Sequence, residues 1–395
     1  TIQWALWKRE LQRAADSAAI AGVYAKVQSA SYNDAVTTDL ARNNDINGIT
    51  IATNATSSPS TGAYTSDSNA VRVILQAQQR LSFSSLFMTA APTITASATA
   101  TIVPSGDYCV VSLVNTSTTG ISVGGTTDVD LGCGMITNST SMDAAVAFGT
   151  SEVDASPIAA VGGIDANDNW TDDTVLLPFT MAQADPFANV YPPTPSGCQK
   201  FSDFDPGNNN KPGGVVDLSS QTGTICIKET GGTPASLDIK GDVKLGAATY
   251  VLDATSLKMT ATGAKLSCTG CTIILTSSTA ATDGSSVGGV DLSGGTVNLV
   301  SPETGTYKGI SIYQDRRAAT GTTNSINGNS GSNFEGAFYF PKTQLKFTGT
   351  SGVTFQCVQM VAWTVVFSGT SEIKNDCSVA GGGMSFKGQS VRLVE

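Results

Sequence analysis

The sequence contains no histidine among its 395 residues. Histidine is the commonest general base and a frequent zinc ligand, so its absence excludes Ser-His-Asp and Cys-His catalytic arrangements and most zinc sites. Charged side chains are scarce as well, at 14% of the chain against about 25% in an average soluble domain. We therefore expect a protein without enzymatic activity and without a cofactor.

Basic residues are outnumbered, which gives a net charge of −10, and no basic run is present. Electrostatic attraction to nucleic acid or to anionic lipid is therefore not expected. No apolar run approaches the ~20 residues of a transmembrane helix. What the chain has instead is 41 glycines and abundant Thr, Ser, Asn and Val, which are typical of short strands joined by tight turns.

Eight cysteines, all beyond residue 100, indicate an oxidising compartment and four disulfides, with free thiols as the alternative. A thioredoxin-like reading of the Cys-x-x-Cys at 268–271 would need a βαβ context that this segment lacks. Pairing by proximity in sequence predicts Cys109–Cys133, Cys198–Cys226, Cys268–Cys271 and Cys357–Cys377. Such a compartment requires export, and because the chain begins with Thr1 we expect an export segment upstream.

Residues 1–105 are predicted to form a small, pilin-like α+β domain. Apolar residues at steps of three and four predict one helix over 1–28, with a single face made of Trp4, Trp7, Leu11, Ala14, Ala18, Ala21 and Ala25. A second helix is expected at 32–43, strands at 48–53, 70–77 and 93–103, and a helical turn at 80–88.

Residues 106–395 show a different pattern, in which two apolar-x-apolar segments flank a glycine turn. It occurs in ISVGGTTDVDLGC (121–133), LDIKGDVKL (237–245), LKMTATGAKLSC (257–268), VDLSGGTVNL (290–299), LKFTGTSGVTFQC (345–357), VVFSGTSEIKNDC (365–377) and MSFKGQSVRLV (384–394). Such units bury one face only by stacking on neighbours, which favours an irregular β-solenoid, with a β-sandwich as the alternative. The Pro-rich and Asn-rich segment 163–212 is expected to be an irregular strap along this body.

The segment Leu11–Ala21, LQRAADSAAIA, resembles the N-terminal signature of the TadE/TadG-like Flp (Tad) pilus-assembly family, where it follows a single transmembrane segment. Further blocks resemble the longer TadG-like members, among them residues 82–100, 109–141, 184–198, 307–316, 324–330 and 336–351. The resemblance implies a secreted or envelope-associated component of pilus or surface-fibre machinery. It also implies that membrane attachment would depend on an upstream segment that this chain lacks.

Two groups of polar residues are candidate sites. Asp165, Asn167 and Asn169 space oxygen atoms like the start of a calcium loop, but Trp170 stands where an EF-hand requires Gly, and a solvated turn is the preferred interpretation. Asp315, Arg316 and Arg317 close an apolar segment; Arg316 would be the base of a β-helical polysaccharide lyase, or the three residues form a capping ion pair, which we prefer.

The expected function is that of a structural component of a bacterial surface filament or Tad/Flp pilus-related assembly, located outside the cell or on its surface. Self-association, or binding to other envelope or pilus proteins, is expected through Ile2, Trp4, Leu6, Trp7, Leu11, Ala14, Ala18 and Ala21. The alternative for the alanine-rich part is that the helix covers its own sheet. A second alternative function is a carbohydrate-binding adhesin, in which Trp170 or Tyr191 would stack on sugars.

Overall fold

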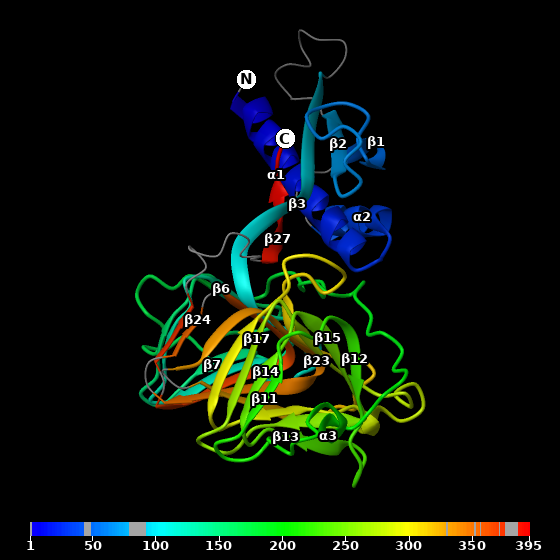
Figure 1. The fold of residues 1–395 in the computed structure, drawn as a ribbon. Helices are drawn as coiled ribbons and strands as arrows, with labels where there is room; N and C mark the ends of the chain where they lie inside the picture. Colours follow the sequence, from blue (N-terminus) through cyan, green and yellow to red (C-terminus); the bar gives the residue numbers. More distant parts are fainter. Residues whose placement is uncertain are drawn as a thin grey trace, which may run out of the picture. The chain divides into compact units, whose positions relative to one another are not determined.

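The computed structural model describes residues 2–42, 49–78, 92–328, 331–350, 353–355, 357–370, 372–375 and 386–395. The chain is mainly β and divides into two compact units (Figure 1). Unit 1 comprises residues 1–105 and 389–395, and unit 2 comprises residues 106–388. The last seven residues therefore belong to unit 1, although the sequence pattern assigned them to the β-rich body.

Unit 1 consists of two helices and an antiparallel sheet. Its elements are α1 (Ile2–Val27), α2 (Tyr32–Arg42), β1 (Ile49–Ser57), β2 (Val71–Gln78) and the first part of β3 (Thr93–Ser112). Strand β2 pairs with β1 on one side and with β3 on the other. Apolar residues of α1, including Leu11, Ala14 and Ala18, are buried with Val71, Val73 and Leu75 of β2 in one core. The helical turn expected at 80–88 lies outside the described residues.

Unit 2 is a β-solenoid in which each coil contributes one strand to each of three faces. The first face contains β11 (Val215–Leu218), β14 (Asp242–Leu245), β17 (Lys265–Thr269) and β20 (Thr296–Val300). The second contains β12 (Gly223–Ile227), β15 (Ala248–Asp253), β18 (Thr272–Thr276) and β21 (Ile310–Gln314). The third contains β13 (Ala235–Asp238), β16 (Thr255–Lys258), β19 (Val290–Leu292) and β22 (Thr323–Gly328). Each strand from β11 to β19 pairs in parallel with the third strand after it, which excludes the β-sandwich alternative.

The next two coils have longer strands that bend from face to face. Strand β23 (Asn333–Thr350) pairs in turn with β20, β21 and β22, and β25 (Val358–Thr370) lies parallel to β23 on the second and third faces. Short strands β24 (Val353–Phe355) and β26 (Glu372–Asn375) pair with each other in a separate parallel sheet.

The coils do not stack in the order of the sequence. The earliest strands of unit 2 continue the stack beyond β25: the end of β3 and strand β4 (Ile121–Gly125) pair with β25, and β5 (Asp128–Asp130) pairs with β26. The stack then proceeds through β6 (Gly134–Thr137), β7 (Ala145–Ala147), β8 (Glu152–Asp154), β9 (Ile158–Ala160) and β10 (Leu176–Leu177). The chain must therefore return from β10, at one end of the solenoid, to β11, at the other.

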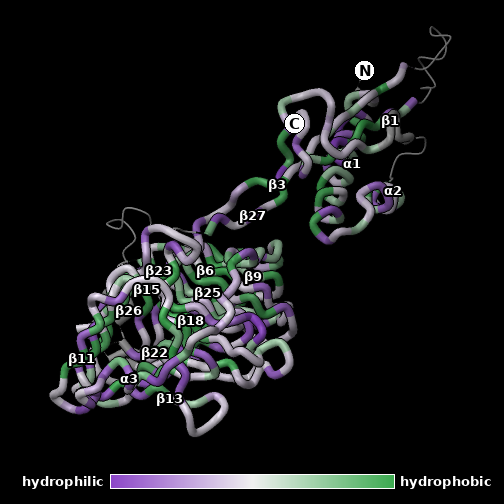
Figure 2. Tube along the Cα trace, turned by 45° about the vertical axis from the view of Figure 1, so that its right-hand side comes forward, coloured by the Kyte–Doolittle hydropathy of each residue, from purple (hydrophilic) through white to green (hydrophobic). Residues whose placement is uncertain are grey.

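Alternation along the strands places one row of side chains inside the solenoid, where rows from successive coils form columns. One column on the third face runs through Ile326, Phe347, Phe367, Val123 and Ala147, all fully buried, and so crosses the point where the sequence order is broken. In Figure 2 apolar segments gather along the stacked strands around β6, β18 and β25.

The glycine-centred motifs are the corners between the third and the first face. In LDIKGDVKL, for example, β13 ends at Asp238 and β14 begins at Asp242. Only the last motif departs from this rule: the described part of MSFKGQSVRLV forms one strand, β27 (Phe386–Leu393), and Val394 and Glu395 exchange backbone hydrogen bonds with Thr99 of unit 1. None of the described helices has the length and apolar character needed to cross a bilayer.

Candidate functional site at the strap

A strap formed by residues 178–200 follows the second face of the solenoid. The strap is shorter than the segment 163–212 expected from sequence, because Ile164, Trp170 and β10 still pair with the coil before them. Gln183 exchanges two hydrogen bonds with Asn138, which follows β6, and Gln199 bonds to Cys226 on β12. Seven strand spacings separate β6 from β12, or roughly 34 Å at about 4.8 Å each.

Apolar side chains on the outside of the second face hold the strap. Phe187 of the strap is buried and packs edge to face on Tyr339 at 5.3 Å and on Phe386 at 5.8 Å between ring centroids. The Tyr339 hydroxyl donates to the Asp185 carboxylate at 2.7 Å, and the Tyr313 hydroxyl donates to the Val190 carbonyl at 2.8 Å. Burial raises the pKa of Tyr313 to about 12 and also raises the pKa of Tyr339, so both hydroxyls stay protonated and able to donate at neutral pH.

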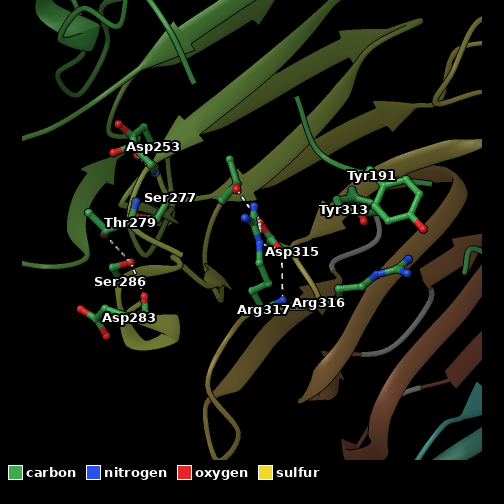
Figure 3. A network of polar contacts seen from close by, with 12 residues as sticks. Tyr191, Asp253, Ser277, Thr279, Asp283, Ser286, Tyr313, Asp315, Arg316 and Arg317 are labelled. Atoms are coloured by element: carbon green, nitrogen blue, oxygen red, sulfur yellow. Dashed lines mark hydrogen bonds and ion pairs between the residues drawn. The ribbon is translucent and has the colours of Figure 1, made fainter. Parts of the chain in front are cut away.

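Arg316 connects the solenoid to the strap (Figure 3). Its guanidinium donates to the carbonyls of Phe187, Ala188 and Val190 and stacks on the ring of Tyr191, 5.1 Å from the centroid. Burial alone would lower the pKa of Arg316, but the nearby Tyr and Asp185 oxygens raise it overall. The hydrogen bonds to the strap carbonyls give Arg316 a structural role, which is to hold the strap on the solenoid, and its role as the base of a lyase stays a prediction.

Asp315 forms the ion pair that the sequence pattern favoured, with Arg317 as its partner. The carboxylate is completely buried, accepts from the Arg317 Nη2 atom at 2.6 Å and accepts from the Thr276 hydroxyl at 2.6 Å. Burial would raise the pKa of Asp315, but the hydrogen bonds from Arg317 and Thr276 outweigh it and lower the pKa. The same strand ends carry a second pair two coils away from Asp315, Asp253 with Lys228 at 2.8 Å.

An open cleft of about 350 Å³ lies between the strap and these strand ends. Its walls are the strap residues 191–195, which read Tyr-Pro-Pro-Thr-Pro, and on the solenoid side Ser277, Ser278, Asp315, Arg316 and Arg317. The Tyr191 side chain is 63% exposed, yet its backbone carbonyl accepts from the Tyr307 hydroxyl at 2.7 Å. Figure 3 shows the ring beside Arg316 at the margin of the strap.

The disulfides hold both the coils and the strap. Cys109–Cys133, Cys198–Cys226 and Cys268–Cys271 are bonded as expected from sequence, and Cys198–Cys226 links the strap to β12. Cys357 is buried and disulfide-bonded, while its expected partner Cys377 lies outside the described residues. Disulfides of this number indicate an oxidising, non-cytoplasmic environment.

The candidate calcium ligands form hydrogen bonds at a corner of a solenoid coil. The Asn167 amide donates to the carbonyl of Ala147 and accepts from the Asn169 backbone, and the Asn169 amide donates to the carbonyls of Gly149 and Ser151. Asp165 accepts from Asn167 at 3.1 Å. In the described part of the chain no group of three or more Cys, Asp or Glu side chains is arranged to hold a metal ion. The hydrogen bonds of Asp165, Asn167 and Asn169 are those of a turn.

Trp170, a candidate sugar platform, lies in the end coil. It is only 6% exposed, its backbone pairs with Val153, and its indole N–H donates to the Asp165 carbonyl at 2.8 Å. A side chain with this burial cannot stack on a sugar, so the prediction that Trp170 is an exposed sugar-binding aromatic is wrong.

The expected assembly residues of α1 fall into two groups. Leu11, Ala14 and Ala18 are buried against β2 and β3, so the helix covers its own sheet there, and Ala21 is half-buried. Leu6 is 52% exposed, and Trp4 and Trp7 are half-buried. The side chain of Ile2 lies outside the described residues.

Sequence reasoning missed the strap contacts of Asp185, Phe187, Tyr313 and Tyr339. A signal was present, because the segment AFYF (337–340) is apolar at every position, and the strand ISIYQ (310–314) has the adjacent apolar residues Ile312 and Tyr313 where strict alternation would give one polar residue. Continuous apolar runs are typical of strands that are buried on both faces. Here the inner face is the solenoid core and the outer face lies under the strap.

The comparisons with known proteins give no relative. No family model matches the chain, and no curated protein and no solved structure is detectably similar to it.

Proposed function

We propose that this protein is a non-catalytic, exported structural component of a bacterial surface filament, related to Tad/Flp pilus machinery. The observation that carries the proposal is that the chain combines a long β-solenoid with a helix that exposes an apolar side chain. Unit 2 is a long, disulfide-bonded solenoid, whereas the helix of unit 1 exposes an apolar residue, Leu6, beside the half-buried Trp4 and Trp7. The resemblance of residues 11–21 to the TadE/TadG-like signature supports the same assignment.

The assembly surface is assigned to the first two turns of α1. The rest of the apolar stripe, from Leu11 onward, is already covered by the sheet of unit 1, so it stabilises the monomer. Burying a leucine-sized side chain such as Leu6 contributes about 1.5–3 kcal/mol, and neighbouring tryptophans add large apolar area that a partner can cover. The partner is a second copy of this chain or another envelope protein.

The proposal is tested with Leu6→Glu in the full chain, with Tyr24→Glu as the matched control. Tyr24 is exposed on the same helix, about five turns further on, so it reports the effect of adding a charge to α1 outside the assembly surface. Electron microscopy and sedimentation should show that the intact protein and Tyr24→Glu associate and that Leu6→Glu stays monomeric. A protein without residues 1–10 should behave like Leu6→Glu. Association of Leu6→Glu equal to that of the intact protein, or an intact protein that stays monomeric at every concentration, contradicts the proposal.

A further inference from the structure

The cleft between the strap and the solenoid has the features of a preformed ligand site. Its volume of about 350 Å³ lies within the range of known ligand pockets, about 300–1,000 Å³. The walls are held in place: three prolines restrict the backbone of the strap, and Arg316 fixes the carbonyls of Phe187, Ala188 and Val190. A site that needs no ordering upon binding retains more of its interaction energy.

The chemistry of the walls is that of an aromatic platform beside positive charge. Tyr191 is 63% exposed, and Arg316 against its ring fixes the ring's orientation. Arg317 uses its Nε and Nη2 atoms on Asp315, and no described residue accepts from its Nη1 atom. Asp315 pairs with Arg317 and accepts a hydrogen bond from the Thr276 hydroxyl, so the solenoid wall of the cleft carries two guanidinium groups, those of Arg316 and Arg317, and one buried carboxylate, in a chain of net charge −10.

We propose that this cleft binds an acidic saccharide, one sugar of which packs on Tyr191 while its carboxylate pairs with Arg317. The C–H groups of a pyranose ring carry partial positive charge and pack on the negative face of an aromatic ring. Guanidinium groups bind carboxylates in preference to neutral hydroxyls, since the hydrogen bonds are charge-assisted. Thr194 and Ser278 line the same walls, and their hydroxyls supply partners for sugar hydroxyls. This binding is independent of the assembly surface on α1.

The experiment is calorimetric titration of the full chain with a galacturonic acid trisaccharide, and with neutral galactotriose as the comparison. The acidic trisaccharide should bind, with an affinity that falls as salt is raised, and the neutral one should bind at least tenfold more weakly. Tyr191→Ala should weaken binding of the acidic trisaccharide at least tenfold. Phe148→Ala, which removes another exposed aromatic ring of unit 2, should leave it unchanged.

Arg317→Lys keeps the charge beside Asp315 but removes the planar guanidinium, and should also weaken binding while the protein remains folded by circular dichroism. Absence of binding to the intact protein, equal binding of the neutral trisaccharide, or equal losses in Tyr191→Ala and Phe148→Ala would each overturn the proposal. Because none of these variants lies in α1, association measured on the same samples separates failure of this inference from failure of the assembly role.

Discussion

Removing the Cys198–Cys226 disulfide should destabilise unit 2 more than removing the disulfide at Cys268–Cys271. The first closes a sequence separation of 28 residues between the strap and β12, and the second closes only 3. In the chain-entropy description, the longer loop restricts the unfolded chain by about 3.6 kcal/mol and the shorter one by about 1.6 kcal/mol. The difference of about 2 kcal/mol is the quantity to be tested.

The assay is thermal and denaturant unfolding of two double variants, Cys198→Ala/Cys226→Ala and Cys268→Ala/Cys271→Ala. At roughly 2–4 °C per kcal/mol for domains of 150–250 residues, a loss of 3.6 kcal/mol corresponds to a fall of about 7–14 °C in Tm, and the short loop to about 3–6 °C. Unit 2 is somewhat larger than such domains, so we expect falls in Tm near the lower end of each range. Equal losses in the two variants would refute the reasoning, because the strap would then be held by its side-chain contacts alone.

Three further predictions concern the same unit. Phe187→Ala should lower the free energy of unfolding by about 3–5 kcal/mol, since a buried ring packed on Tyr339 is lost; chemical denaturation checks this. The pKa of Asp315 is lower in the folded protein than in the unfolded chain, where it is near 3.9. The contribution of this carboxylate to the free energy of unfolding is therefore present above the unfolded pKa and is lost as pH falls through the folded pKa. Asp315→Asn should flatten the acid limb of the curve of stability against pH and destabilise the protein at neutral pH. Alkylation of the unreduced, denatured protein should label no cysteine in mass spectra, and labelling of Cys357 and Cys377 together would show that their expected pair does not form.

The sequence allowed the local structure to be predicted because local chemistry decides it. The helix α1 follows from apolar residues at helical spacing, and each glycine corner follows from two short alternating segments around a residue that tolerates a tight turn. The three described disulfides were predicted by proximity in sequence: Cys109–Cys133 joins neighbouring coils, Cys198–Cys226 joins the end of the strap to β12, and Cys268–Cys271 lies within one coil, between β17 and β18.

The order of the coils could not be predicted in the same way. Parallel pairing of β25 with β4 depends on residues more than 240 positions apart, and any coil with the same alternation would satisfy β25 equally well. The strap has no periodicity, so its course becomes visible only when Phe187 and Arg316 are placed on the second face. The cleft beside Tyr191 could not be predicted for the same reason, since its two walls come from segments about 120 residues apart.

The broken coil order has a mechanical consequence. The chain passes between the two units in β3 and again in β27, and the rung of β3 lies inside the stack, between β25 and β6, rather than at an end. A terminal coil of a repeat protein contacts a neighbour on one side only and is the first to peel away under load. A pull transmitted through β3 instead acts on a rung with hydrogen bonds on both sides. When the chain is pulled through β3, this arrangement distributes tension over the middle of the solenoid and leaves both of its ends unloaded.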